Sequence, residues 1–165
     1  MGISAALFRK DLSLFGEFGK QGTGYTIESL AQQVQSILKV DKVWDVVVVG
    51  AGDIGSALAR YPGLNNRGFQ VVMLFDTNLE KIGADIGGFI IQDAAGMIEK
   101  IQTAGIQIAM MAVPAGAAQE VADQLVQAGV KAILNYAPIS INIPPDVRVQ
   151  YIDPVTHLQR MTYYL

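Results

Sequence analysis

The pattern of hydrophobic and polar positions changes near residue 43. Before that point, apolar residues recur every three or four positions, which predicts amphipathic helices over residues 3–15 and 26–40. After it, short apolar runs alternate with stretches of helical periodicity. Strands that alternate with helices predict an α/β fold, with a doubly wound parallel sheet, right-handed crossovers and helices on both faces.

The expected elements of this sheet follow one another along the rest of the chain. Strands are expected near residues 45–50, 69–75, 89–91, 106–112, 130–135 and 147–152. Helices are expected near residues 53–60, 94–104 and 115–128. An apolar stripe near the C-terminus predicts a last helix, and it consists of Val155, Leu158, Met161 and Leu165.

Composition and charge narrow the class of protein. The 165 residues are 51% hydrophobic and 16% charged, which excludes a disordered chain and suffices for one well-buried domain. No apolar run approaches the ~20 residues that a membrane span needs, and no signal peptide opens the chain, so we expect a cytoplasmic protein without membrane contact. The absence of cysteine excludes thiolate metal sites and cysteine nucleophiles, and no metal site is predicted. The net charge of −3 gives no global attraction to nucleic acid.

A glycine-rich turn follows the first apolar strand. The sequence VVVVGAGDIG, residues 46–55, places Gly50, Gly52 and Gly55 in the spacing G-x-G-x-x-G. In this motif the first glycine allows a tight turn, the second the close approach of a pyrophosphate, and the third close packing of helix on strand. The turn is typical of a Rossmann-like fold, and its predicted cofactor contacts are Gly50, Ala51, Gly52, Asp53, Ile54 and Gly55. A tight turn without a ligand is the alternative.

Asp76 ends the next strand, about 20 positions after Gly55, where a carboxylate can accept hydrogen bonds from both adenosine ribose hydroxyls. A 2′-phosphate would meet this carboxylate. Thr77 and Asn78 offer no cation to neutralise it, and the nearest one in sequence is Lys81. These residues favour NAD over NADP. The alternative is that Asp76 only shapes its turn.

Two later loops end strands of the same predicted sheet, at the edge where open α/β sheets bind ligands. They are AVPAGAA, residues 112–118, and NYAP, residues 135–138. Asn135 is a candidate hydrogen-bonding group. The apolar residues expected to form a wall of the site are Val113, Pro114, Ala137 and Pro138. Ordinary loop structure is the alternative, because proline and glycine commonly occur in such turns.

No catalytic group is predicted beside this wall. The only histidine of the sequence, His157, lies in the C-terminal tail, where we expect it on a helix surface or at an interface. No tyrosine is followed by a lysine three or four positions later. The sequence therefore predicts a protein that binds a cofactor without catalysing its reaction, and not an enzyme.

Several segments, in order over essentially the whole chain, carry a resemblance to a known family. They are FRKDLSLFGEFGKQGTGY, VVVVGAGDIGSALARYPG, FDTNLEKIG, VPAGAAQEVADQLVQAG, ILNYAPI and DPVTHLQRMTYYL. Together they resemble the redox-sensing transcriptional repressors of the Rex family. The resemblance implies a partial winged-helix DNA-binding segment with its linker helix over residues 1–40, and a Rossmann domain for NAD or NADH over residues 41–152. It also implies a C-terminal helix, residues 153–165, that is swapped between the subunits of a homodimer.

The same resemblance implies DNA contacts near the start of the chain. Residues 4–14 would be the helix that reads DNA, and residues 16–25 would be the wing. The implied contact residues are Arg9, Lys10, Lys20 and Tyr25. The sequence starts at the recognition helix, without the helices that brace it, and its wing carries one basic residue where the family usually has two. We therefore expect operator binding by the full-length form and weak or no binding by this chain alone.

A switch between subunits is implied as well. Tyr61 resembles a residue that meets the partner subunit near the nicotinamide, and Asp153 resembles its counterpart at the start of the swapped helix. Pro154 stands where an apolar or aromatic residue commonly follows the aspartate. The leading hypothesis is a homodimeric repressor that senses the NADH/NAD ratio and releases operator DNA by changing its dimer arrangement. A small NAD-dependent oxidoreductase and a coenzyme A-binding domain are the alternatives.

Overall fold

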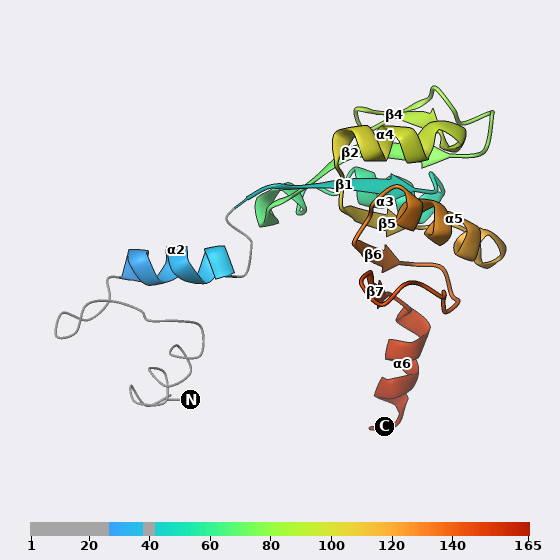
Figure 1. Cartoon of the computed structure of the whole chain (residues 1–165). Coiled ribbons are helices and arrows are strands. Elements are labelled where there is room, and N and C mark those ends of the chain that lie inside the picture. Colours follow the sequence, from blue (N-terminus) through green and yellow to red (C-terminus); the bar gives the residue numbers. More distant parts are fainter. Residues whose placement is uncertain (1–26, 38–41) are drawn as a thin grey trace. The chain divides into compact units, whose positions relative to one another are not determined.

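The computed structural model describes residues 27–37 and 42–165. The chain divides into two units, with the boundary between Val43 and Trp44. In the first unit the structure describes one helix, α2 (Ile27–Ile37), at the place where the periodicity predicts it (Figure 1). The implied DNA contacts lie outside the described residues; they are Arg9, Lys10, Lys20 and Tyr25.

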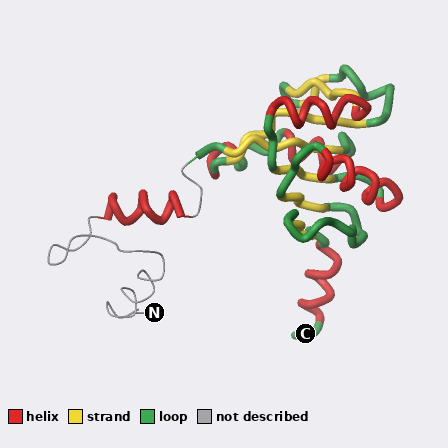
Figure 2. Tube along the Cα trace, viewed as in Figure 1, coloured by secondary structure: helices red, strands yellow, loops and turns green. Residues whose placement is uncertain are grey.

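The second unit is built on a seven-stranded sheet with the strand order β3-β4-β2-β1-β5-β6-β7 (Figure 2). The strands are β1 (Trp44–Val49), β2 (Phe69–Asp76), β3 (Asp85–Ile86), β4 (Phe89–Asp93), β5 (Ile108–Met111), β6 (Ala132–Asn135) and β7 (Arg148–Tyr151). All neighbouring strands are parallel except β3 and β4, which form an antiparallel hairpin. The predicted α/β fold with a parallel sheet is confirmed.

Helices pack on both faces of this sheet. They are α3 (Asp53–Ala59), α4 (Met97–Ala104) and α5 (Ala115–Gln127), with single 3₁₀ turns at η1 (Asn65–Arg67) and η2 (Ala94–Gly96). A further helix, α6 (Pro154–Thr162), follows β7 and has no buried residue. One face is covered by α4 and α5, whose Ile101 and Leu125 pack in a core with Val47. On the other face, Ala59 of α3 packs in a core with Val46. Consecutive valines of β1 therefore face opposite cores, which is why the strand is an uninterrupted apolar run.

The β3–β4 hairpin was not predicted. Its turn consists of Gly87 and Gly88, whose φ angles of 65° and 92° both lie in the left-handed region. Two such residues form the turn that joins antiparallel strands most tightly, and the pair Gly-Gly is a sequence signal for it. A Cβ atom at Gly87 would overlap the side chain of Arg60, so the aliphatic part of this arginine lies directly against the hairpin.

Candidate functional site

A cleft of about 770 Å³ opens at the carboxyl ends of β1, β2, β4 and β5. The strand order reverses at β1, because the chain continues to β2 on one side and returns to β5 on the other. Open α/β sheets bind their ligands at such a reversal. The predicted cofactor residues that line the cleft are Gly50, Gly52, Asp53, Ile54, Asp76, Val113, Pro114 and Pro138.

The three glycines of the turn have different surroundings. Gly50 has a φ of 97°, and a Cβ atom there would overlap the carbonyl group of Ala112. A Cβ atom at Gly55 would overlap the carbonyl oxygen of Gly50, so this glycine lies where helix α3 touches the turn. At Gly52, no heavy atom of the described residues other than Gly52 and its two chain neighbours lies within 4 Å of where a Cβ would be. The turn is therefore packed at its two ends and open at Gly52.

Helix α3 starts beside this open position. It begins at Asp53, and its N-cap Gly52 has no side chain with which to bind the amides of the first turn. The amides at a helix N-terminus have no partner within the helix and carry the positive end of its dipole. Asp53 and Ile54 line the cleft. Donors for an anion therefore lie next to the space at Gly52.

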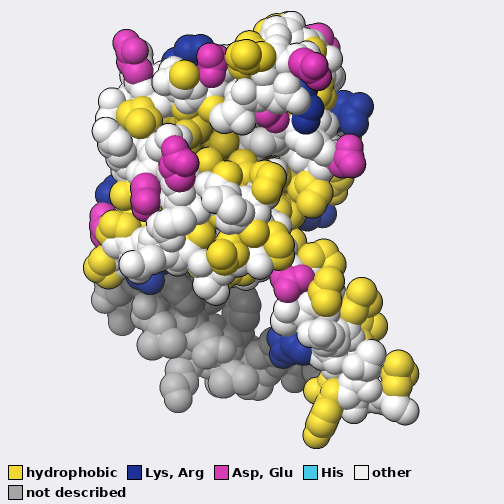
Figure 3. All heavy atoms as spheres, turned by 90° about the vertical axis from the view of Figure 1, so that its right-hand side faces the viewer, with side chains coloured by type: hydrophobic (Ala, Val, Ile, Leu, Met, Phe, Trp, Pro, Cys, Tyr) yellow, Lys and Arg dark blue, Asp and Glu magenta, His cyan; other side chains and the backbone are white. Residues whose placement is uncertain are grey.

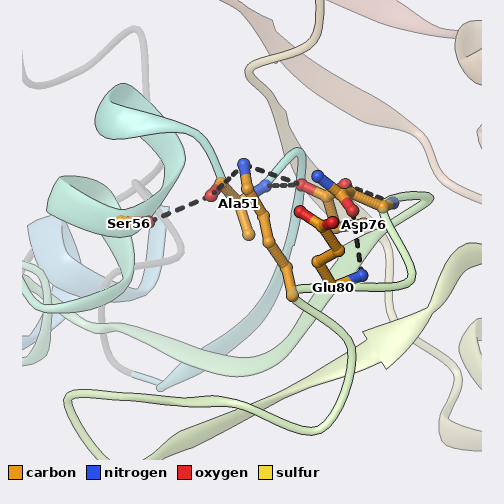
Figure 4. Close-up of polar contacts among 6 residues, drawn as sticks. Ala51, Ser56, Asp76 and Glu80 are labelled. Carbon is orange, nitrogen blue, oxygen red and sulfur yellow. Dashed lines mark hydrogen bonds and ion pairs between the residues drawn. The ribbon is translucent and has the colours of Figure 1, made fainter.

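Asp76 holds the turn from the end of β2 (Figure 4). One oxygen, Oδ2, accepts a hydrogen bond of 2.7 Å from the amide of Ala51, and Oδ1 accepts one of 2.8 Å from the amide of Asn78. The residue thus shapes its own turn and also faces the cleft. A carboxylate has about four lone-pair positions, so acceptor capacity remains for hydroxyl donors of a ligand.

Lys81 lies beside this carboxylate. Its Nζ is 3.9 Å from Oδ2 of Asp76 and donates a hydrogen bond of 3.2 Å to the carbonyl oxygen of Ala51. Ser56 donates to the same carbonyl oxygen from the other side, as Figure 4 shows. Sequence reasoning named Lys81 only as the nearest cation along the chain, and the fold brings it to the carboxylate.

Part of the cleft lining is apolar. Val113 and Pro114 follow β5, and Pro138 follows β6. Asn135 is completely buried. Its side chain donates a hydrogen bond of 3.0 Å to the carbonyl oxygen of Ile139 and accepts one of 2.8 Å from the amide of Ala137. This asparagine thus folds the loop behind the wall. Of the remaining predicted contacts, Ala51, Gly55 and Ala137 are buried as well.

Other residues of the cleft were missed by sequence reasoning. They come from the end of β4, from η2, from the start of α4 and from one side of α5, and are Asp93, Ala94, Ala95, Met97, Glu120, Val121 and Gln124. Among these residues, Asp93 could have been predicted from the sequence, because it ends a parallel strand at the same edge of the sheet. Ala117 and Tyr136 also line the cleft and lie in the predicted segments 112–118 and 135–138. Burial raises the pKa of the Tyr136 hydroxyl.

The implied switch residues lie outside the cleft wall. Tyr61 follows α3 and is half exposed. Asp153 is the N-cap of α6, where it accepts hydrogen bonds of 2.9 Å from the amide of Val155 and 2.7 Å from the hydroxyl of Thr156. The hydrogen bond from Thr156 lowers the pKa of this carboxyl. Asp153 borders a second cavity of about 360 Å³, at the start of α6.

Two features do not occur in the part of the chain that the structure describes. Within residues 27–37 and 42–165, no group of three or more His, Asp or Glu side chains is arranged to hold a metal ion. In the same residues, no helix is both long and apolar enough to cross a membrane.

Comparisons with known proteins place the chain in a family. A family model described as CoA binding domain matches residues 41–139. The redox-sensing transcriptional repressor Rex of Chloroflexus aggregans (strain MD-66 / DSM 9485) is 50% identical over 163 residues, which are 99% of this chain and 77% of that protein. The chain belongs to the Rex family. The resemblance identified from its motifs is thereby confirmed, and Rex proteins are named as repressors and not as enzymes.

Solved structures of a Rex-family protein have the same fold. RSP in complex with β-NAD⁺ and operator DNA has a TM-score of 0.86 at 34% identity, and the match covers 98% of this chain and 75% of the RSP chain. RSP in complex with β-NADH has a TM-score of 0.80 at 32% identity, with the same coverage. Both oxidation states of the cofactor and operator DNA are therefore ligands of a Rex-family relative.

Proposed function

We propose that this chain is a Rex-type redox-sensing repressor of the cytoplasm that binds NAD or NADH in the cleft and releases operator DNA when NADH is bound. The observation that carries the proposal is the open position at Gly52, with helix α3 on one side of the turn and the Asp76 carboxylate on the other. The ligands of RSP support the same choice of cofactor and of DNA partner.

Each part of the cofactor has a matching part of the cleft. The space at Gly52 and the amides of Asp53 and Ile54 would hold the pyrophosphate. Asp76 would accept the adenosine ribose hydroxyls. The wall of Val113, Pro114 and Pro138 would receive the nicotinamide. When bound, the cofactor would supply a nicotinamide ring that is cationic in NAD⁺ and neutral in NADH.

NADH is expected to bind about a hundredfold more tightly than NAD⁺, a difference of about 2.7 kcal/mol. The two forms share the adenosine and the pyrophosphate, so the turn and Asp76 cannot distinguish them. Only the nicotinamide differs, and moving a cationic ring from water against an apolar wall costs free energy unless an anion meets it. A ligand shifts an equilibrium only through different affinities for two states, so a sensor needs this difference.

Calorimetric titration of the cofactor-free protein with each form measures this preference. ADP-ribose, which lacks the nicotinamide, is the reference ligand and reports the contribution of the shared part. Equal affinities for NADH and NAD⁺ would leave a plain dinucleotide-binding domain and would contradict the sensing function.

Replacing Asp76 by alanine is expected to weaken NADH by about tenfold or more, because each hydrogen bond to a charged group contributes about 1.5–3 kcal/mol. The preference for NADH over NADPH is expected to shrink as well. Without the carboxylate, the Nζ of Lys81 would be the remaining charge near the ribose and would attract a 2′-phosphate.

Affinities of the variant for NADH and NADPH test this expectation. Asp76→Asn removes the charge and keeps one of the two backbone hydrogen bonds, because its side chain has a single accepting oxygen. Asp146→Ala is the matched control, because this exposed carboxylate pairs with Lys131 on the surface and does not line the cleft. An unchanged cofactor preference in Asp76→Ala would mean that the carboxylate only shapes the turn.

Coenzyme A is the second candidate ligand, favoured by the match to the CoA binding domain model. The cleft does not favour its additional 3′-phosphate. Among the described residues that line it, Asp53, Asp76, Asp93 and Glu120 are acidic and Lys81 is the one cation. Competition between NADH and coenzyme A distinguishes the two ligands.

Helix α6 supports a homodimer. Each residue from Pro154 to Leu165 is exposed, and the helix projects away from the sheet (Figure 1). Its apolar residues include Val155, Leu158 and Met161, which are 59%, 61% and 64% exposed, and Figure 3 shows hydrophobic side chains along it. A nine-residue helix is unstable in water without packing, so we infer that α6 lies on a partner subunit.

A further inference from the structure

The loop between β6 and β7, residues 136–147, separates the cofactor cleft from the second cavity. Pro138 lines both spaces. On its far side, the second cavity is bounded by Tyr151, Asp153 and His157, at the end of β7 and the first turn of α6. A displacement of the loop at Pro138 therefore changes the nicotinamide wall and the base of α6 together.

Side chains from different elements fasten this loop. Asn135 of β6 holds its first residues, as described above. The side chain of Gln119 in α5 accepts a hydrogen bond of 2.8 Å from the amide of Asn142 and donates one of 2.9 Å to the carbonyl oxygen of Asn142. The hydroxyl of Tyr151 accepts a hydrogen bond of 3.1 Å from the amide of Ile141 and donates one of 3.4 Å to the carbonyl oxygen of Ile141. The neighbouring residues Ile141 and Asn142 are thus held by side chains of two different elements, α5 and β7.

Tyr151 differs from the other two residues in its place along the chain. It is the last residue of β7. The amide of the next residue, Ile152, donates a hydrogen bond of 2.9 Å to the carbonyl oxygen of Asn135. Asp153 then caps α6. Through its hydroxyl, Tyr151 connects the loop that carries Pro138 to the strand that leads directly into α6.

We propose that Tyr151 is a positioning residue that holds the nicotinamide wall and couples its position to α6. The proposal rests on the proposed function, in which the nicotinamide lies against Pro138. Removal of the hydroxyl releases Ile141 and lets the wall move independently of the helix. The phenyl ring remains in place, so the change is confined to this connection.

Tyr151→Phe tests the proposal with three ligands. Its affinity for ADP-ribose is expected to stay within about twofold of the wild type, because the turn and Asp76 are untouched. Its preference for NADH over NAD⁺ is expected to fall about fivefold or more. Lys131→Met is the matched control, since it releases the same loop at Asp146 through an exposed ion pair far along the chain from Pro138.

Hydrogen exchange of residues 152–162 supplies the readout at the helix. In the wild type, NADH is expected to change exchange in this segment, and in Tyr151→Phe this change is expected to be lost while protection of the glycine turn by NADH remains. Retention of the full cofactor preference or of the full response at α6 would overturn the proposal, as would an equal loss of ADP-ribose binding. If wild-type protein bound no NADH, the proposed function itself would fail.

Discussion

Gly52→Ala is expected to weaken NADH binding about a hundredfold while leaving the free energy of unfolding within about 0.5 kcal/mol of the wild type. The backbone at Gly52 has a φ of −77°, which alanine adopts without strain. Apart from residues 51–53, no described heavy atom lies within 4 Å of the added Cβ, so the unliganded protein has room for it. The methyl group would occupy the place that the pyrophosphate needs.

Gly55→Ala is the matched comparison, three positions along the same turn. Its Cβ would overlap the carbonyl oxygen of Gly50, which is backbone and cannot rotate away. Overpacking of this kind costs about 1–3 kcal/mol, and we expect Gly55→Ala to be destabilised by at least this amount. Urea unfolding measures the stabilities, and calorimetry measures the NADH affinities. Wild-type affinity in Gly52→Ala would mean that the pyrophosphate does not lie at this turn.

If the proposed homodimer forms through α6, deletion of residues 154–165 is expected to leave a monomer at micromolar concentration. The deleted helix exposes Val155, Leu158 and Met161, and burying each such side chain contributes about 1.5–3 kcal/mol. A dimer contains two copies of the helix, so the loss applies twice. Light scattering measures the mass of the deleted and intact proteins.

Point variants distinguish loss of contact from loss of the whole helix. Leu158→Asp places a charge on the apolar stripe and is expected to raise the dissociation constant of the dimer about a hundredfold or more. Gln159→Asp changes a neighbouring exposed polar position and is expected to leave the dimer intact. A dimer that persists after deletion of residues 154–165 would place the interface on another surface.

The periodicities of the sequence by themselves determined the fold class and the glycine turn. The valine run of β1, the alternation of strands with helices and the spacing of Gly50, Gly52 and Gly55 are local patterns, and local patterns report directly on backbone conformation. The same order of motifs identified the Rex family. Asp76 could be placed opposite the turn because parallel strands end at one edge of a sheet.

Only the tertiary structure decided which side chains meet at that edge. Lys81 lies beside Asp76 because the loop after β2 folds back on the turn, and Asn135 is buried because its loop closes around the amide. Glu120 reaches the cleft through the orientation of α5, and the hydroxyl of Tyr151 binds a peptide ten residues earlier. These contacts depend on how loops fold and how helices are oriented, and hydrophobic periodicity contains no information on either.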